Sequence, residues 1–262
     1  MYLEFAGLPG SGKSTLSSAL NKHLLSLPCN ALSSNEAIIQ CIRRRDDGYI
    51  KNLLKRLPLR VWKSLIGSEY ALSEFVKLSS RNLEVIALIS KMLSKSNLDK
   101  LMIESIWSTI VKSFVEIQLV SQYLYDSELA IMDEAFTQRC FTLFGYMDNS
   151  SVSDELIFKY AQLAPISNQV FWIVTHPQIC VERFMLRYES RPLPYDFKLD
   201  KNELLDNFET GNRVLQHLTK ALENQGKCVH RINGDGDINQ SIAKICKIGS
   251  DIWLENIQNS NC

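Results

Sequence analysis

GLPGSGKS, residues 7–14, decides the fold of this 262-residue chain. It matches the pattern G-x-x-x-x-G-K-[ST] at every fixed position. The short apolar run YLEFA (residues 2–6) precedes it, and residues 14–27 carry apolar side chains at helical spacing after it. A strand, a glycine-rich turn and a helix in this order are the context in which the pattern binds phosphate. We therefore predict a phosphate-binding loop (P-loop) at residues 7–14.

The residue types of the P-loop suit a nucleoside triphosphate. Glycines allow successive backbone N–H groups to point into one concavity, and the start of the following helix adds partial positive charge. Lys13 would supply a positive charge to the β- and γ-phosphates, and the Ser14 hydroxyl would bind Mg²⁺. The predicted ATP-binding residues are Gly7, Leu8, Pro9, Gly10, Ser11, Gly12, Lys13, Ser14 and Thr15.

The composition is that of an ordinary globular protein, with 45% hydrophobic and 22% charged residues. Because 29 Lys and Arg balance 29 Asp and Glu, the whole chain lacks the strong positive charge of a nucleic-acid-binding domain. The seven cysteines show no metal-ligand spacing and are interpreted as reduced thiols. No apolar run approaches the ~18 residues of a membrane span, and no signal peptide is recognisable. We expect a cytoplasmic protein without a membrane span.

Further short apolar runs predict buried parallel strands at residues 129–132, 170–174 and 228–232, with a short strand at 29–32. Each run leads into a helical pattern, which is typical of an α/β fold. The helices expected in the second half of the chain cover residues 137–147, 153–163, 178–189, 201–224 and 237 to about 256.

Residues 34–126 show helical periodicity and almost no strand signal. Ser33 and Glu36 have the spacing of a capping box, so a helix is expected to begin there. The segment is too long for a plain crossover between parallel strands, and we interpret it as a helical insertion in one domain over residues 1–262. Its basic part, residues 43–63, is interpreted as a solvated helix face, with a phosphorylated or nucleic-acid acceptor as the alternative.

Two carboxylates, Asp133 and Glu134, follow the apolar run LAIM (residues 129–132). Buried parallel strands deliver the residues at their C-terminal ends to the sheet edge where ligands bind. Asp133 is therefore expected to hold Mg²⁺ beside the P-loop. Glu134 has two interpretations: it caps the following helix, or it orients a water molecule for attack.

Three arginines, Arg183, Arg187 and Arg191, are spaced by four residues after the run VFWIV. This spacing places them on one helix face, within about 80° of arc. Arginine suits phosphoryl chemistry because its planar, always charged guanidinium binds phosphate through two N–H groups. A polar, proline-containing stretch follows, and we predict a lid over residues 183–199. The alternative is a solvated helix face whose arginines pair with neighbouring glutamates.

The chain resembles the P-loop nucleoside and nucleotide kinases, especially the thymidylate kinase-like members, in four stretches. These are GLPGSGKST (7–15), LAIMDEAFTQR (129–139), VERFMLRYESRP (181–192) and HRINGDGDINQSIAKI (230–245). The similarity covers about the first 30 residues and most of residues 128–250. The P-loop indicates nucleotide binding in general, whereas the arginines and the closing strand, loop and helix favour kinases within that class.

This resemblance implies a three-layer sandwich around a five-stranded parallel sheet, with the P-loop strand central and the strand of Asp133 beside it. It also implies an arginine lid over ATP and a loop, Asn233–Asp237, against the adenine base. Nucleotide kinases usually carry an Asp-Arg pair where this chain has Asp133-Glu134, and the next arginine here is Arg139. Arg139 and Arg191 are the residues expected to bind the acceptor.

The leading hypothesis is a kinase that transfers the γ-phosphate of ATP to a small-molecule acceptor, with a nucleoside or nucleotide as one candidate class. Lys13, Asp133, Arg183 and Arg187 are its expected catalytic residues, and Ser14 with Asp133 its Mg²⁺ ligands. The alternative is a P-loop ATPase or nucleotide-dependent switch in which Glu134 orients water. A non-catalytic binding module and a homodimer are also left open.

Overall fold

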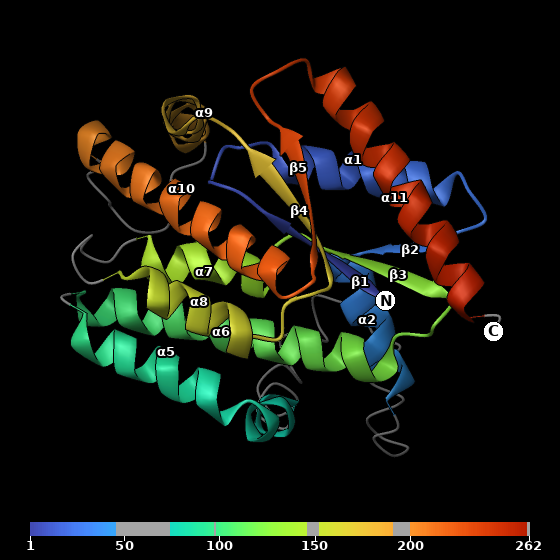
Figure 1. Ribbon diagram of the computed structural model, residues 1–262, viewed down its shortest axis with the longest axis horizontal. Helices are drawn as coiled ribbons and strands as arrows, with labels where there is room; N and C mark the ends of the chain where they lie inside the picture. The colour runs from blue at the N-terminus through green and yellow to red at the C-terminus, as the bar shows by residue number, and fades with distance from the viewer. Residues whose placement is uncertain (46–73, 97, 146–151, 191–199, 261–262) are drawn as a thin grey trace.

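The computed structural model describes residues 1–45, 74–96, 98–145, 152–190 and 200–260. Its centre is a parallel sheet with the strand order β2-β3-β1-β4-β5 (Figure 1). This order places the P-loop strand in the middle and the strand of Asp133 beside it, so the predicted α/β class with a five-stranded parallel sheet is confirmed. The strands are β1 (Tyr2–Ala6), β2 (Asn30–Ser33), β3 (Glu128–Met132), β4 (Gln169–Val174) and β5 (Cys228–Asn233).

The helices agree with the periodicity of the sequence to within a few residues. The capping box predicted at Ser33 is present: the Ser33 N–H donates to Glu36 Oε2 at 2.9 Å where α2 begins. Residues 74–81 are also helical. The helices with established bounds are α1 (Lys13–Leu25), α2 (Ser34–Arg44), α5 (Leu83–Lys95), α6 (Lys100–Tyr123), α7 (Phe136–Phe144), α8 (Asp154–Leu163), α9 (Pro177–Ser190), α10 (Lys201–Asn224) and α11 (Ile238–Ser260).

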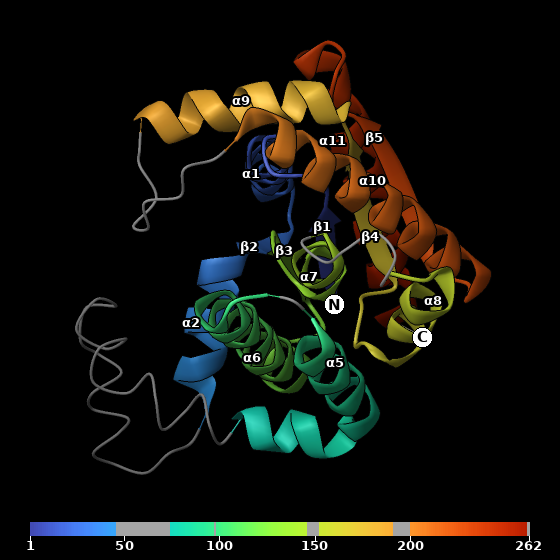
Figure 2. The same cartoon turned by 90° about the vertical axis from the view of Figure 1, so that its left-hand side faces the viewer.

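Two separate hydrophobic cores make the three layers. Alternate side chains of a strand point to opposite faces of the sheet, so each strand contributes to both cores. One core contains Leu3 and Phe5 of β1 and is covered by α1 and α11. The other contains Ala6 of β1 and is covered by α2, α6, α7, α8 and α10. Figures 1 and 2 show α1 and α11 together on one side of the sheet and the remaining helices largely on the other.

The segment between β2 and β3 is helical wherever the structure describes it, as the sequence predicted. Helices α2, α5 and α6 lie in this segment, and their apolar side chains belong to the larger core. Much of the basic stretch 43–63 lies outside the described residues. Of its described part, Arg44 pairs with Glu128 at 2.5 Å and Arg45 with Glu74 at 2.5 Å, so these two side chains anchor α2.

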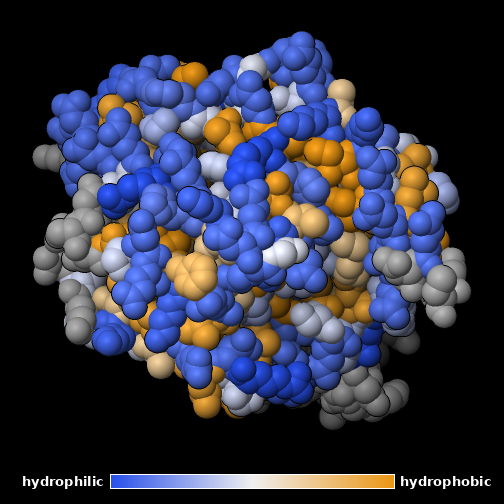
Figure 3. All heavy atoms as spheres, in the orientation of Figure 1, coloured by the Kyte–Doolittle hydropathy of each residue, from blue (hydrophilic) through white to orange (hydrophobic). Residues whose placement is uncertain are grey.

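The outer surface is predominantly hydrophilic on the face drawn in Figure 3, with hydrophobic side chains between the polar ones. In the part of the chain that the structure describes, no helix combines the length and the apolar character needed to span a membrane. The predicted division into one domain with an insertion remains a prediction.

Candidate active site

The P-loop joins the end of β1 to the start of α1 at the C-terminal edge of the sheet. Gly10 and Gly12 both have positive φ, at 81° and 95°, a conformation that side chains with a Cβ adopt at a cost. A Cβ on Gly10 would also lie 2.5 Å from the carbonyl oxygen of Cys180 in α9. Gly10 is therefore required by both the turn and the close approach of α9.

Lys13 points back along the P-loop. Its Nζ donates hydrogen bonds to the carbonyl oxygens of Gly7 at 2.8 Å and Leu8 at 2.9 Å. Burial lowers the pKa of Lys13 to about 8, and the nearby carboxylate of Glu134 opposes this decrease. The ammonium group thus occupies the concavity of the loop, where phosphate oxygens could replace the two carbonyls as its partners.

Asp133 follows β3 and faces the first turns of α1. Its carboxylate lies close to Ser17, whose hydroxyl donates to the Ser14 carbonyl oxygen at 3.3 Å. Burial raises the pKa of Asp133, and the nearby Ser17 hydroxyl opposes the increase. Ser14 itself is exposed at the start of α1. The structure therefore brings the two predicted magnesium ligands to the same end of one helix.

The donor types at this position fit Mg²⁺. Magnesium takes hard oxygen ligands, usually one or two from the protein with the rest from phosphate and water. A serine hydroxyl and a carboxylate beside a P-loop meet this requirement. Among the residues that the structure describes, no group of three or more His, Cys, Asp or Glu side chains could hold a metal ion, so an all-protein metal site is not indicated there.

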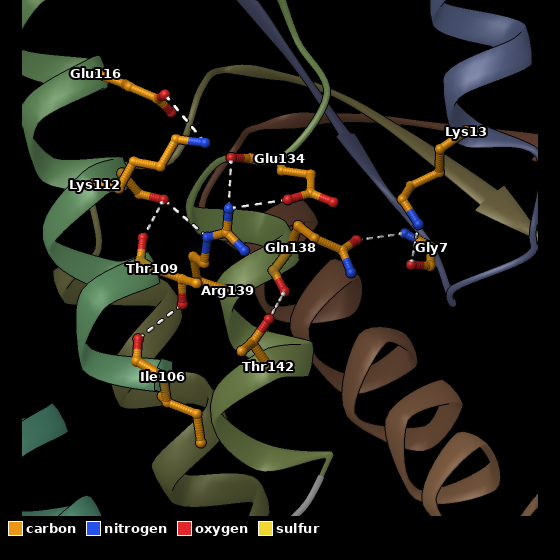
Figure 4. Close-up of polar contacts among 11 residues, drawn as sticks. Gly7, Lys13, Ile106, Thr109, Lys112, Glu116, Glu134, Gln138, Arg139 and Thr142 are labelled. Carbon is orange, nitrogen blue, oxygen red and sulfur yellow. Dashed lines mark hydrogen bonds and ion pairs between the residues drawn. The ribbon is translucent and has the colours of Figure 1, made fainter. Parts of the chain in front are cut away.

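Glu134 and Arg139 form an ion pair beside this edge (Figure 4). Arg139 Nη2 donates to Glu134 Oε2 at 3.2 Å and to the Glu134 carbonyl oxygen at 3.3 Å, and Arg139 Nε donates to Ser113 Oγ of α6 at 2.9 Å. The Arg139 side chain is only 6% exposed, whereas that of Glu134 is 60% exposed. Arg139, predicted to bind the acceptor, is therefore largely engaged by the protein itself.

Sequence reasoning missed the residues that fix α7 to the sheet. Gln138 Oε1 accepts a hydrogen bond from the Gly7 N–H of the P-loop at 3.2 Å, as Figure 4 shows. The fully buried Glu4 of β1 accepts from the Thr137 N–H at 2.8 Å and from the Ser167 N–H at 2.8 Å. Burial raises the pKa of Glu4, and these donors oppose the increase. A glutamate inside a buried strand was the only available signal, because its partners are distant in sequence.

The two described arginines of α9 have different surroundings, although both are exposed. Arg183 Nη1 donates to the Gly234 carbonyl oxygen at 3.1 Å, so this side chain reaches the loop after β5. Arg187 lies close enough to Lys13 for its charge to lower the Lys13 pKa. Arg191 and the rest of the predicted lid, residues 191–199, lie outside the described residues.

The loops after β4 and β5 meet beside the P-loop through hydrogen bonds. Thr175 Oγ1 donates to the Ser11 carbonyl oxygen at 3.2 Å, and the Gly234 N–H donates to the Val174 carbonyl oxygen at 2.7 Å. The carboxylate of Asp235 accepts from the His176 N–H at 2.9 Å. The loop Asn233–Asp237 is thus held next to the P-loop. That it contacts adenine remains a prediction.

Comparisons with known proteins give a likeness among solved structures and no family match. The chain matches no protein-family model, and a search of curated proteins found no match. Among solved structures it is similar to a thymidylate kinase from Ehrlichia chaffeensis, with 16% sequence identity and a TM-score of 0.44. That similarity covers 95% of this chain and 97% of the other.

Proposed function

We propose that this protein is an ATP-dependent phosphotransferase that moves the γ-phosphate of ATP to a small-molecule acceptor. The observation that carries the proposal is the convergence of three segments on Lys13: the P-loop, the carboxylates after β3 and Arg187 of α9. Phosphoryl transfer is catalysed mainly by positioning and by charge neutralisation, and this is the chemistry that such a set of side chains supplies.

Each residue has a distinct part in this proposal. Backbone N–H groups of the P-loop and the Lys13 ammonium would bind the β- and γ-phosphates. Ser14 and Asp133 would hold Mg²⁺, which when bound neutralises charge on the phosphate oxygens. Arg187 would approach the transferred group from the opposite side and stabilise the charge that develops on the leaving oxygen.

In the transfer step an oxygen of the acceptor forms a bond to the γ-phosphorus while the bond from that phosphorus to the β–γ bridging oxygen breaks. When the acceptor oxygen is a hydroxyl, its proton passes to a carboxylate at the end of β3, and ADP leaves with the bridging oxygen.

A second candidate is a P-loop ATPase, and the exposure of Glu134 favours it. An exposed carboxylate whose charge acts on Lys13 could orient a water molecule toward the γ-phosphate. The ion pair with Arg139 weighs against this role, because it holds Glu134 Oε2 on the side of the helix rather than free to accept a proton. We therefore place the kinase first.

Product analysis with γ-labelled ATP tests the proposal. A kinase transfers label to an acceptor from a panel of nucleosides, nucleotides, sugars and amino alcohols, and releases little inorganic phosphate without one. Lys13→Ala serves as the inactive control, and Lys22→Ala, an exposed lysine on the same helix, as the matched active control. Release of inorganic phosphate at the same rate with and without every acceptor would favour the ATPase instead.

A further inference from the structure

The guanidinium of Arg139 is engaged on the edge that binds anions. An arginine binds a phosphate through two N–H groups on one edge of its guanidinium. In Arg139 the Nε donates to Ser113 Oγ at 2.9 Å, and Nη2 donates to both the carbonyl and the carboxylate of Glu134. With 6% of its side chain exposed, Arg139 does not present this edge to a ligand.

The Glu134 carboxylate is paired with Arg139 and also lies near Lys13 of the P-loop. It lies close enough to Lys13 for its charge to oppose the decrease in the Lys13 pKa. Because Lys13 is the residue placed to hold the γ-phosphate, a molecule that receives this phosphate must lie within the field of Glu134.

A second carboxylate, Glu116 of α6, belongs to the same group of charges. The Glu116 side chain is 16% exposed, and burial raises its pKa while Lys112 and Arg139 oppose the increase. The charge of Glu134 also reaches Glu116. Lys112 Nζ lies 3.6 Å from Glu116 Oε1, and Figure 4 shows Lys112, Glu116, Arg139 and Glu134 grouped between α6 and α7. Both positive charges of this group are thus paired with carboxylates.

A phosphate on the acceptor would be unfavourable in this setting. A phosphomonoester carries up to two negative charges at neutral pH. It would meet the exposed carboxylate of Glu134, and binding through the Nε and Nη2 edge of Arg139 would require it to displace Glu134 and Ser113. A neutral alcohol avoids this repulsion, and an alcohol that carries an ammonium group would be attracted by Glu134.

We propose that Glu134 determines acceptor specificity: through its ion pair with Arg139 it restricts transfer to neutral or cationic alcohols and excludes acceptors that already carry a phosphate. This inference rests on the proposed kinase function and names the substrate class of the same site. It makes Glu134 a specificity residue rather than the base that activates water.

Matched pairs of compounds test the inference by turnover. Each pair holds an alcohol and its own phosphomonoester: the common nucleosides with their 5′-monophosphates, and glucose and glucosamine with their 6-phosphates. The expected result is label transfer from γ-labelled ATP to non-phosphorylated members only. Preferential transfer to the phosphomonoesters would overturn the inference and leave the kinase function standing, whereas release of inorganic phosphate alone would defeat the kinase function.

Binding provides a readout that needs no turnover. Calorimetry on protein loaded with a non-hydrolysable ATP analogue would compare uridine with uridine 5′-monophosphate. Wild-type protein is expected to favour uridine, and Glu134→Gln to shift the ratio of the two affinities toward the monophosphate by about tenfold or more, because Arg139 loses its charged partner. Glu155→Gln, an exposed glutamate in the first turn of α8, is the control and should leave the ratio unchanged. Tighter binding of the monophosphate by wild type, or an unchanged ratio in Glu134→Gln, would refute the role of Glu134.

Discussion

The candidate site has a proposed nucleotide side, at the P-loop and α9, and a proposed acceptor side, around Arg139. The two sides are built in different ways. On the nucleotide side, Lys13 bonds to carbonyl groups of Gly7 and Leu8, only five and six residues away. On the acceptor side, Arg139 bonds to Ser113, 26 residues away, and Gln138 bonds to Gly7, 131 residues away. The first is a local motif that one stretch of sequence encodes, whereas the second is an assembly of helices around the sheet.

The two sides also differ in how far their arginine side chains are exposed. Arg183 and Arg187 on the nucleotide side are exposed, so they are accessible to a ligand. Arg139 on the acceptor side is buried and bonded to other protein groups. We therefore expect single substitutions on the nucleotide side to change rate constants. Substitutions in the buried ion pairs among the helices that cover the larger core should change specificity or stability instead.

Arg187→Ala is expected to have the largest effect. An arginine that stabilises the transferring phosphoryl group is worth about 10³- to 10⁵-fold in rate. The variant should lower kcat by about 10³-fold or more with little change in the KM for ATP, because the contact is made chiefly in the transition state. Steady-state kinetics measure both constants. Arg231→Ala, at a surface pair with Glu223, is the control, and an Arg187→Ala enzyme as active as this control would contradict the assignment.

Lys13→Ala should lower kcat/KM by about 10²- to 10³-fold, the usual cost of removing one preorganised donor to a developing charge. Circular dichroism and thermal unfolding should show an intact fold, because Lys13 is only partly buried and hydrogen-bonds to the loop carbonyls. A variant that keeps half of the wild-type rate would refute the phosphate-site assignment.

The pH dependence of kcat/KM tests the assignment of Lys13 to the phosphate site. Burial lowers its pKa to about 8 from the ordinary 10.5, so the free enzyme loses this positive charge as the pH rises through about 8. The kcat/KM for ATP, which reports the free enzyme, should therefore fall above pH 8. Lys13→Arg should not show this fall, because a guanidinium stays charged. A wild-type profile that is flat to pH 10 would contradict the lowered pKa.

Gly10→Ala tests whether the P-loop depends on its contact with α9. Its φ of 81° nearly equals the 79° of Gly226, and a left-handed residue with a Cβ costs about 1–2 kcal/mol in either place. At Gly10 the new Cβ would also lie 2.5 Å from a Cys180 backbone atom, whereas nothing lies within 4 Å at Gly226. Gly10→Ala should therefore lower the melting temperature more than Gly226→Ala, and it alone should weaken ATP binding. Equal melting temperatures would show that the P-loop tolerates the added methyl group.

Glu128→Gln removes the ion pair between Arg44 of α2 and Glu128 of β3. It should have the smallest effect, a loss of stability with no change in activity. Arg44 donates to Glu128 Oε2 at 2.6 Å and pairs with Oε1 as well, which lowers the pKa of Glu128. Hydrogen bonds to charged groups are worth about 1.5–3 kcal/mol, so denaturant titration at pH 7 should show a loss of that order.

The pH dependence of this loss follows from the sign of the pKa change. A carboxylate with a lowered folded-state pKa stabilises the protein fully above its ordinary value of 4.5, and the stabilisation disappears as the pH falls through the lowered pKa. The difference between wild type and Glu128→Gln should therefore shrink below pH 4.5. Glu223→Gln, which removes a more exposed pair, is the control, with an expected loss of at most about 1 kcal/mol. A larger loss for Glu223→Gln than for Glu128→Gln would contradict this ranking.

The sequence by itself determined the sheet and the local conformation of the P-loop. Strand β1 and helix α10 lie at the bounds that their apolar patterns predicted, and the capping box at Ser33 begins α2. Hydrophobic periodicity, glycine-rich turns and helix caps act over a few residues. They can therefore be recognised in the sequence without knowledge of the tertiary contacts.

Only the tertiary structure decided the acceptor side. The resemblance to nucleotide kinases led us to predict that Arg139 binds the acceptor. Whether its guanidinium is available to a ligand depends on Ser113 of α6 and on Glu134 after β3, which bond to it. It also depends on burial, which leaves 6% of the side chain exposed. Likewise Glu4 looks like an exception in an apolar strand until Thr137 and Ser167 appear as its donors. Burial and the pairing of charges depend on distances between segments far apart in the chain, and these exist only after the chain has folded.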